Sequence, residues 1–158
     1  MFIVHTKDSY NKIFSELYNI TNGSVILGGS LSLYYMKIIN RNPNDLDVTM
    51  TLDDWMLYKK NIEKHFRVIP NVKMSYDGFE YEVYNCFEIK NKINEFHLFV
   101  NYDSNIFDMV DDLRILNPVY LLKVKELILK ENQLYENGEL SEKHISDITS
   151  IKQYLNDK

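Results

Sequence analysis

Two aspartates, Asp45 and Asp47, stand one residue apart in segment 45–50, where polar and apolar residues alternate. Side chains at positions i and i+2 of a β-strand lie on the same face, so a strand here would hold the two carboxylates about 6–7 Å apart. Hard oxygen ligands at that separation can bind Mg²⁺ together with the phosphates of a nucleotide. A chain this rich in aspartate contains such a pair by chance, so a solvated turn is the alternative interpretation.

A glycine turn precedes the aspartate pair. Gly28, Gly29 and Ser30 follow the short apolar run 24–27 and precede a helix-sized apolar stretch, 31–39. Glycines let the backbone approach a phosphate closely, and the first turn of a helix offers unpaired N–H groups and the positive end of its dipole. Ser30 could cap this helix and also donate its hydroxyl to phosphate or to metal-bound water. The alternative is a tight structural turn with Ser30 as a plain N-cap.

The spacing between these two motifs matters more than either alone. One helix and one loop separate them, so the second strand can return beside the first and bring the carboxylates next to the glycine turn. Arg41, four residues before Asp45, could supply a planar cation to phosphate oxygens, and a surface arginine is the alternative. The sequence therefore favours one site that gathers phosphates, metal and carboxylates.

The run Val25-Ile26-Leu27-Gly28-Gly29-Ser30, followed by Arg41-x-Pro43-x-Asp45-Leu46-Asp47, resembles the opening of the polymerase-beta-like nucleotidyltransferase superfamily. The minimal nucleotidyltransferases and the abortive-infection type IV toxin branch are the most similar. That toxin branch adds a lysine-bearing helix and an Arg-x-Lys-Asp-like motif. Lys125 and the segment Lys143-His144-x-x-Asp147 look similar to these later elements. Only the opening motif is specific.

The resemblance implies transfer of a nucleoside monophosphate from a nucleoside triphosphate to a hydroxyl on RNA (such as tRNA), on a protein or on a small molecule. By analogy, Asp45 and Asp47 would bind Mg²⁺, with two ions possible, and the glycine turn would hold the triphosphate. Lys125 would bind phosphate, while Lys143 and Asp147 would position nucleotide or acceptor. An exposed i,i+4 ion pair between the last two is the alternative. The toxin branch also implies an antitoxin-like protein partner.

One position departs from this pattern. Active members often carry a third carboxylate on a later strand, and the residue that aligns with it here is His97. Glu95 shares the face of His97 and could substitute from one step away. His97 could itself act as a base, since its unperturbed pKa lies near neutrality. A satisfied buried histidine in a degenerate site is the other alternative.

Hydrophobic periodicity predicts the elements that position these residues. Apolar residues at spacings of three and four predict helices at 8–20, at 31–39 and from the Thr51 cap to about Phe66. Two further helices are predicted, one from Asn117-Pro118 to about Glu136 and one from Ser141 onward. The apolar stripe of the last helix consists of Ile145, Ile148, Ile151 and Leu155. Strands are predicted at 24–27, 45–50, 72–76, 79–84 and 95–102, with an Asp77-Gly78 hairpin turn and an acidic connection at 103–112.

This order predicts an α/β (α+β) chain with the nucleotidyltransferase fold, in which helices pack on a mixed β-sheet and a C-terminal helical pair follows. We expect a single domain, 1–158, made of a core, 1–112, and a helical extension, 113–158. The length suffices for one hydrophobic core.

Composition limits the class of protein. The formal charge of −5 argues against broad non-specific nucleic-acid binding, and no apolar run is long enough to span a membrane. A single cysteine, Cys86, predicts a core thiol, and with no signal-like start it favours a cytoplasmic protein. Two rival functions stay open. One is a degenerate nucleotidyltransferase-fold module that binds a nucleotide or a protein, and the other is a phage- or toxin-system interaction module that uses 103–112 as its contact surface.

Overall fold

The computed structural model describes residues 2–69, 72–76, 79–89, 94–133 and 138–158. Within these ranges the helices are α1 (Asp8–Ile20), α2 (Gly29–Tyr35), α3 (Leu52–His65), α4 (Pro118–Gln133) and α5 (Gly138–Asn156). The strands are β1 (Ile26–Leu27), β2 (Asp47–Thr51), β3 (Phe66–Val68), β4 (Val72–Tyr76), β5 (Phe79–Glu88), β6 (Glu95–Asn101), β7 (Phe107–Val110) and β8 (Leu113–Leu116).

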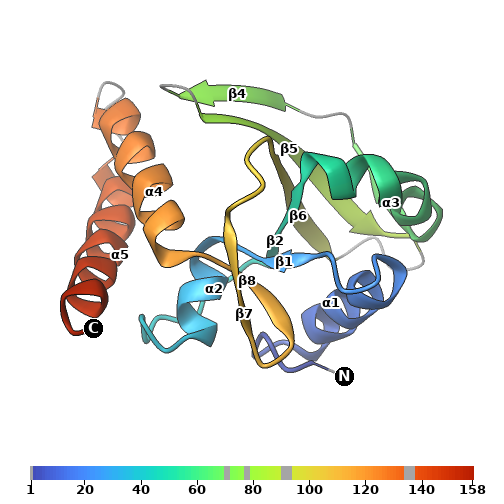
Figure 1. Ribbon diagram of the computed structural model, residues 1–158, viewed down its shortest axis with the longest axis horizontal. Coiled ribbons are helices and arrows are strands. Elements are labelled where there is room, and N and C mark those ends of the chain that lie inside the picture. The colour runs from blue at the N-terminus through green and yellow to red at the C-terminus, as the bar shows by residue number, and fades with distance from the viewer. Residues whose placement is uncertain (1, 70–71, 77–78, 90–93, 134–137) are drawn as a thin grey trace.

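The strands form one mixed sheet in the order β3-β5-β6-β2-β1-β8-β7, with β4 paired to β5. Strand β2 runs parallel to β6 and β1 runs parallel to β8, whereas β1 and β2 are antiparallel. Helices α1 and α3 lie at one end of the view in Figure 1, and the pair α4–α5 lies at the other. The predicted mixed α/β architecture with a C-terminal helical pair is confirmed at this level.

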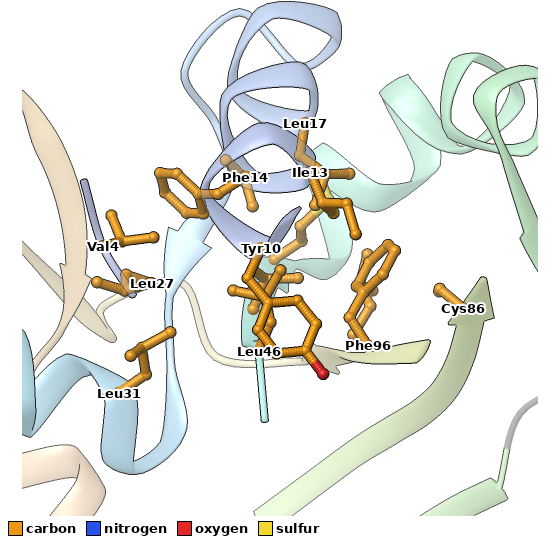
Figure 2. Packing of buried hydrophobic residues seen from close by; sticks show 14 of the residues in the cluster. Val4, Tyr10, Ile13, Phe14, Leu17, Leu27, Leu31, Leu46, Cys86 and Phe96 are labelled. Atoms are coloured by element: carbon orange, nitrogen blue, oxygen red, sulfur yellow. The ribbon is translucent and has the colours of Figure 1, made fainter. Parts of the chain in front are cut away.

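The main core lies between the sheet and helix α1. Tyr10, Ile13, Phe14 and Leu17 project from one side of α1, and Figure 2 shows them above residues of the sheet such as Phe96. Every second residue of the central strands joins this core, namely Val48 and Met50 on β2, with Leu46 just before it, and Phe96, Leu98 and Val100 on β6. Because side chains alternate along a strand, the residues between them face the opposite side of the sheet, towards α4 and α5.

The end of α1 and the N-caps of α3 and α4 have the local structure that the sequence predicted. Helix α1 ends where Asn22 and Gly23 adopt positive φ angles of 51° and 77°. Thr51 caps α3, since its hydroxyl oxygen accepts a hydrogen bond from the Asp54 N–H. Asn117 caps α4 in the same way, with Oδ1 accepting from the Val119 N–H at 2.8 Å.

The helix that follows the glycine turn differs from its prediction. It begins at Gly29, after the N-cap Gly28, so Ser30 lies inside the helix and is not its cap. It ends at Tyr35 instead of Ile39, because Lys37 adopts φ 62° and the Ile38 N–H bonds back to the Leu33 carbonyl. Because of this left-handed turn at the end of the helix, the Ile39 side chain points into a second, smaller hydrophobic core, where it is 7% exposed.

The segment predicted as an acidic connection, 103–112, contains strand β7 and the turn of a β-hairpin that was not predicted. Strands β7 and β8 pair antiparallel, and Asp111 and Asp112 between them both have positive φ, 51° and 64°. Two such residues form a type I′ turn, which aspartate tolerates better than most side chains. Strand β8 completes the sheet next to β1, so the sheet continues beyond the predicted boundary at residue 112 and the helical extension begins at Pro118.

Other predictions at the edges of elements need smaller corrections. Strand β5 continues to Glu88, four residues beyond the predicted end. On α5, Ile148 and Ile151 are buried as expected, but Ile145 is 49% exposed and does not belong to the packed stripe. The Asp77-Gly78 turn and the end of α4 at Glu136 lie outside the described residues. No helix in the described ranges is long and apolar enough to cross a membrane.

Replacing Asp112 with glycine is expected to stabilise the protein by about 0.5–1 kcal/mol, because glycine adopts a left-handed conformation without the steric cost of a Cβ atom. Asp111 is kept, since its carboxylate accepts a hydrogen bond from the Tyr35 hydroxyl. Urea unfolding measures the change. Asp112→Val, which favours the opposite backbone region, should destabilise the hairpin, and equal stability of the two variants would contradict the assigned turn.

Cys86 is fully buried in the main core, where burial raises the pKa of its thiol to about 12. Only the thiolate reacts readily with alkylating reagents. We therefore expect native protein at pH 8 to resist a maleimide or iodoacetamide, while urea-unfolded protein reacts fully, as followed by intact mass. Rapid labelling of the native protein would contradict this packing.

Candidate functional site

The sheet face opposite α1 carries the polar residues of the site. Asp47 on β2 pairs in register with His97 on β6, and Thr49 pairs with Phe99 two residues further along. This register follows from the alternation in both strands, which buries the apolar set on one face and leaves these side chains on the other. The position aligned by resemblance with a third carboxylate therefore lies directly beside Asp47.

The glycine turn packs against Asp47, as predicted from the spacing of the two motifs. The Gly28 N–H donates to the Asp47 carbonyl at 3.0 Å, because β1 and β2 are antiparallel neighbours. A Cβ atom on Gly29 would lie 2.6 Å from Asp47 Oδ2, and Gly29 has φ +56°. Only glycine satisfies both constraints, so position 29 brings the backbone directly against the carboxylate.

Asp45 is placed differently from Asp47. It lies on a bend before β2, which begins only at Asp47, and its side chain is exposed. Asp45 does not line the adjoining cavity, yet its charge helps to raise the pKa of His97. The pair is thus one carboxylate fixed on the sheet and one on the preceding loop.

A buried charge cluster lies on the other side of the glycine turn. Asp147 on α5 is 2% exposed and accepts hydrogen bonds from the Ser30 hydroxyl at 2.9 Å, from Lys125 Nζ at 2.9 Å and from Arg41 Nη2 at 2.8 Å. Lys125 on α4 is itself 5% exposed and also lies 3.2 Å from Ser30 Oγ. Four predicted site residues from four separate segments therefore meet at one point.

The charge state of this cluster follows from its geometry. Burial by itself would raise the pKa of Asp147, but the charge of Lys125 and the hydrogen bonds from Lys125, Arg41 and Ser30 lower it overall. Asp147 is therefore ionised at neutral pH and neutralises one of two neighbouring cations. With both cations charged, the cluster carries a net charge of about +1, which suits an incoming anion.

Lys143 does not join this cluster. Its side chain is exposed on α5, and it does not line the cavity, so the predicted Lys143–Asp147 pair is replaced by Asp147 with Lys125 and Arg41. The neighbouring His144 does line the cavity and was missed. Its Nδ1 lies 3.4 Å from Lys125 Nζ, and burial together with Lys125 lowers its pKa to about 4. The i,i+3 spacing of His144 and Asp147 on one helix face is the signal that could have found it.

His97 is a half-buried histidine between two carboxylates. Its Nδ1 lies 3.3 Å from Asp47 Oδ1, and its Nε2 lies 3.7 Å from Glu95 Oε1. The hydrogen bond with Asp47 raises the pKa of His97, although burial works against it. The neighbouring carboxylates thus stabilise the protonated form of His97 relative to that of an ordinary histidine, at the position where the resemblance expects a carboxylate.

A cavity of about 200 Å³ connects these groups. Its polar lining consists of Gly29, Ser30, Asp47, Thr49, Asn101, Lys125 and His144, and its apolar lining consists of Tyr81, Phe99, Leu116, Tyr120, Leu121 and Val124. Asp47 pairs with His97, and Asn101 lies four residues further along β6, about 13 Å away at the rise of a strand. The cavity therefore extends along the sheet from the charged residues to an aromatic region under α4.

The resemblance implies a magnesium ion, which oxygen ligands at the cavity would have to hold. No three His, Cys, Asp or Glu side chains within the described ranges are grouped closely enough to hold a metal ion. Magnesium, however, is usually bound through one or two carboxylates, with water and substrate phosphate as its other ligands. Asp47, which lines the cavity, is a carboxylate of the kind that such an open site uses, and Asp45 lies on the adjoining loop.

The chain matches no protein-family model, no curated protein and no solved structure.

Proposed function

We propose that the protein is a magnesium-dependent nucleotidyltransferase that moves a nucleoside monophosphate from a nucleoside triphosphate to a hydroxyl of RNA, protein or a small molecule. The observation that carries the proposal is the convergence of Gly29, Ser30, Asp47 and Lys125 on one cavity. Gly29, Ser30 and Asp47 were selected from the type and spacing of their residues, and Lys125 from the resemblance. Their convergence from two helices, α2 and α4, and one strand, β2, supports a common role.

Phosphate oxygens would replace contacts that Asp147 now makes. Ser30, Lys125 and Arg41 all donate to its carboxylate, and the same donors suit a phosphate. Asp147 thus keeps the three donors oriented and the two cations partly neutralised. A triphosphate with its larger charge would compete for them at the open side of the cluster, where the Arg41 side chain is 38% exposed.

The proposed reaction is a displacement at the α-phosphorus of the bound triphosphate. The acceptor oxygen attacks the α-phosphorus, the bond to the β-phosphate breaks, and pyrophosphate leaves. Magnesium, held by Asp47 and Asp45, would supply positive charge against the leaving pyrophosphate. The acceptor proton would pass to Glu95 or to neutral His97, and since the pKa of His97 is raised, its neutral form becomes available at a higher pH than that of an ordinary histidine.

A second candidate function is supported by a specific observation. His97 pairs with Asp47 at the position expected for a third carboxylate, so the site suits binding more directly than turnover. In this alternative the protein is a degenerate member of the fold that binds a nucleotide or a protein partner, in a phage or toxin–antitoxin setting. The hairpin β7–β8 with Asp108, Asp111 and Asp112 is then the surface available to an antitoxin-like partner.

One experiment separates these candidates. The protein is incubated with each of the four nucleoside triphosphates, Mg²⁺ and total RNA, while pyrophosphate release is followed. Calorimetry with the same nucleotides is run in parallel. Turnover with binding supports the transferase, binding without turnover supports the degenerate module, and neither result with any nucleotide overturns the proposed nucleotide site.

A further inference from the structure

Two buried side chains that line the cavity each have a polar atom with no hydrogen-bond partner among the described residues. Thr49 is 2% exposed, and its hydroxyl makes no hydrogen bond with any described residue. Asn101 is 6% exposed, and its Nδ2 likewise has no partner in the described part of the chain. An unsatisfied buried polar group costs about 1–3 kcal/mol, so two such groups lining one cavity mark it as built for a polar ligand.

The walls around these groups are aromatic. Tyr81 on β5 and Phe99 on β6 lie with ring centroids 6.2 Å apart, and Tyr120 of α4 also lines the cavity. A flat heteroaromatic ring matches such walls, and stacking of a base on an aromatic side chain is worth about 1–3 kcal/mol. The volume of about 200 Å³ is below the ~300–1,000 Å³ that encloses a whole ligand, so it takes the ring and leaves the phosphates at the charged end.

The orientation of Asn101 determines which ring edge fits. The Tyr120 hydroxyl donates to Asn101 Oδ1 at 2.7 Å. Burial raises the pKa of Tyr120, so the phenol keeps the proton that it donates. Since Oδ1 is occupied, the amide offers its Nδ2 donor to the cavity, and a donor recognises a carbonyl oxygen better than an amino group.

We propose that the inner part of the cavity binds the nucleobase, and that Asn101 selects bases with a ring carbonyl, so that UTP, CTP and GTP bind more tightly than ATP. This inference rests on the proposed nucleotide function and adds the base specificity of the same site. A site that donates to an exocyclic carbonyl discriminates against adenine, because adenine has an amino group as its exocyclic substituent and offers only ring nitrogens as acceptors. One such mismatch corresponds to about tenfold or more in affinity.

The test is equilibrium calorimetry with Mg²⁺ and each of the four triphosphates, for wild type, Asn101→Asp and Tyr120→Phe. Wild type is expected to bind ATP about tenfold more weakly than the tightest of the other three. Asn101→Asp replaces the donor with an acceptor that Tyr120 can still serve, so ATP should gain affinity relative to UTP, whose base carries no amino group. Tyr120→Phe frees the amide to rotate, so ATP and the carbonyl bases should bind within about threefold of one another.

Controls keep this test distinct from that of the proposed function. Asn105→Asp, an exposed change outside the cavity, should keep the wild-type order, and thermal unfolding shows whether each variant folds. If Asn101→Asp fails to fold, Tyr120→Phe carries the test. Equal binding of all four nucleotides, tightest binding of ATP, or equally tight binding of inorganic tripolyphosphate by wild type overturns the base inference alone. Absence of binding by every nucleotide overturns the proposed function as well.

Discussion

Replacing Asp47 with asparagine is expected to lower kcat/KM for nucleotidyl transfer by at least about 100-fold. Asparagine keeps the shape of the side chain beside Gly29 but removes the charge that would hold magnesium. Loss of a group that only supports a metal ligand typically costs 10–100-fold, so loss of the ligand itself costs more. The measurement is steady-state pyrophosphate release with saturating Mg²⁺ and the best nucleotide.

The matched control for this change is Asp53→Asn. Asp53 is an exposed aspartate on α3, on the other face of the sheet from the cavity, and its substitution should leave kcat/KM within about twofold of wild type. Calorimetry of Asp47→Asn with nucleotide then shows whether binding also depends on this carboxylate. Full activity of Asp47→Asn would remove Asp47 from the chemistry and would contradict the proposed magnesium site.

Particular residues show why the site could be anticipated from the sequence. The glycines and Asp47 are separated by a single helix and loop, so local connectivity and the antiparallel pairing of β1 with β2 bring them together. The period-two pattern likewise fixes which face His97 and Glu95 occupy. Lys125 and Asp147 were found only through the resemblance, since contacts between α4, α5 and the glycine turn span 95 and 117 residues of sequence.

The missed features have equally definite causes. The hairpin β7–β8 escaped because its turn is Asp111-Asp112 and not an Asn-Gly or Asp-Gly pair, and because four aspartates at 103–112 suggest a solvated loop. Helix α2 ends early because Lys37 adopts the left-handed conformation that glycine usually occupies at the end of a helix, so no glycine in the sequence marks this end. Asn101 and Thr49 carry no sequence signal at all, since their significance lies in polar atoms that have no hydrogen-bond partner in the described part of the chain.

The cluster around Asp147 is expected to contribute strongly to stability as well as to the site. Lys125 and Asp147 are both nearly fully buried, so each charge depends on the other for compensation. Removing one member of a buried pair leaves an uncompensated charge and typically costs about 3–5 kcal/mol. Arg41 adds little to that figure, because its side chain is 38% exposed and screened by solvent.

We therefore expect Asp147→Ala to lower the free energy of unfolding by about 3 kcal/mol, measured by urea unfolding at pH 7. Asp147→Asn keeps an acceptor oxygen for Ser30 and should lose less. Glu142→Ala, an exposed change on the same helix, serves as the control and should stay within about 0.5 kcal/mol of wild type. A loss below about 1 kcal/mol for Asp147→Ala would mean that Lys125 gives up its proton or reaches solvent without its partner.

The pH dependence of this difference identifies its electrostatic origin. The pKa of Asp147 lies below its usual 3.8 in the folded protein, so the folded state favours the ionised form. The stability that Asp147 contributes is then complete above the unfolded pKa and is lost as pH falls through the lower, folded value. The gap between wild type and Asp147→Ala should accordingly be constant from pH 8 to pH 5 and should narrow below about pH 4. A gap that stays unchanged down to pH 2 would assign the loss to side-chain packing, because a cavity left by a missing carboxylate does not titrate.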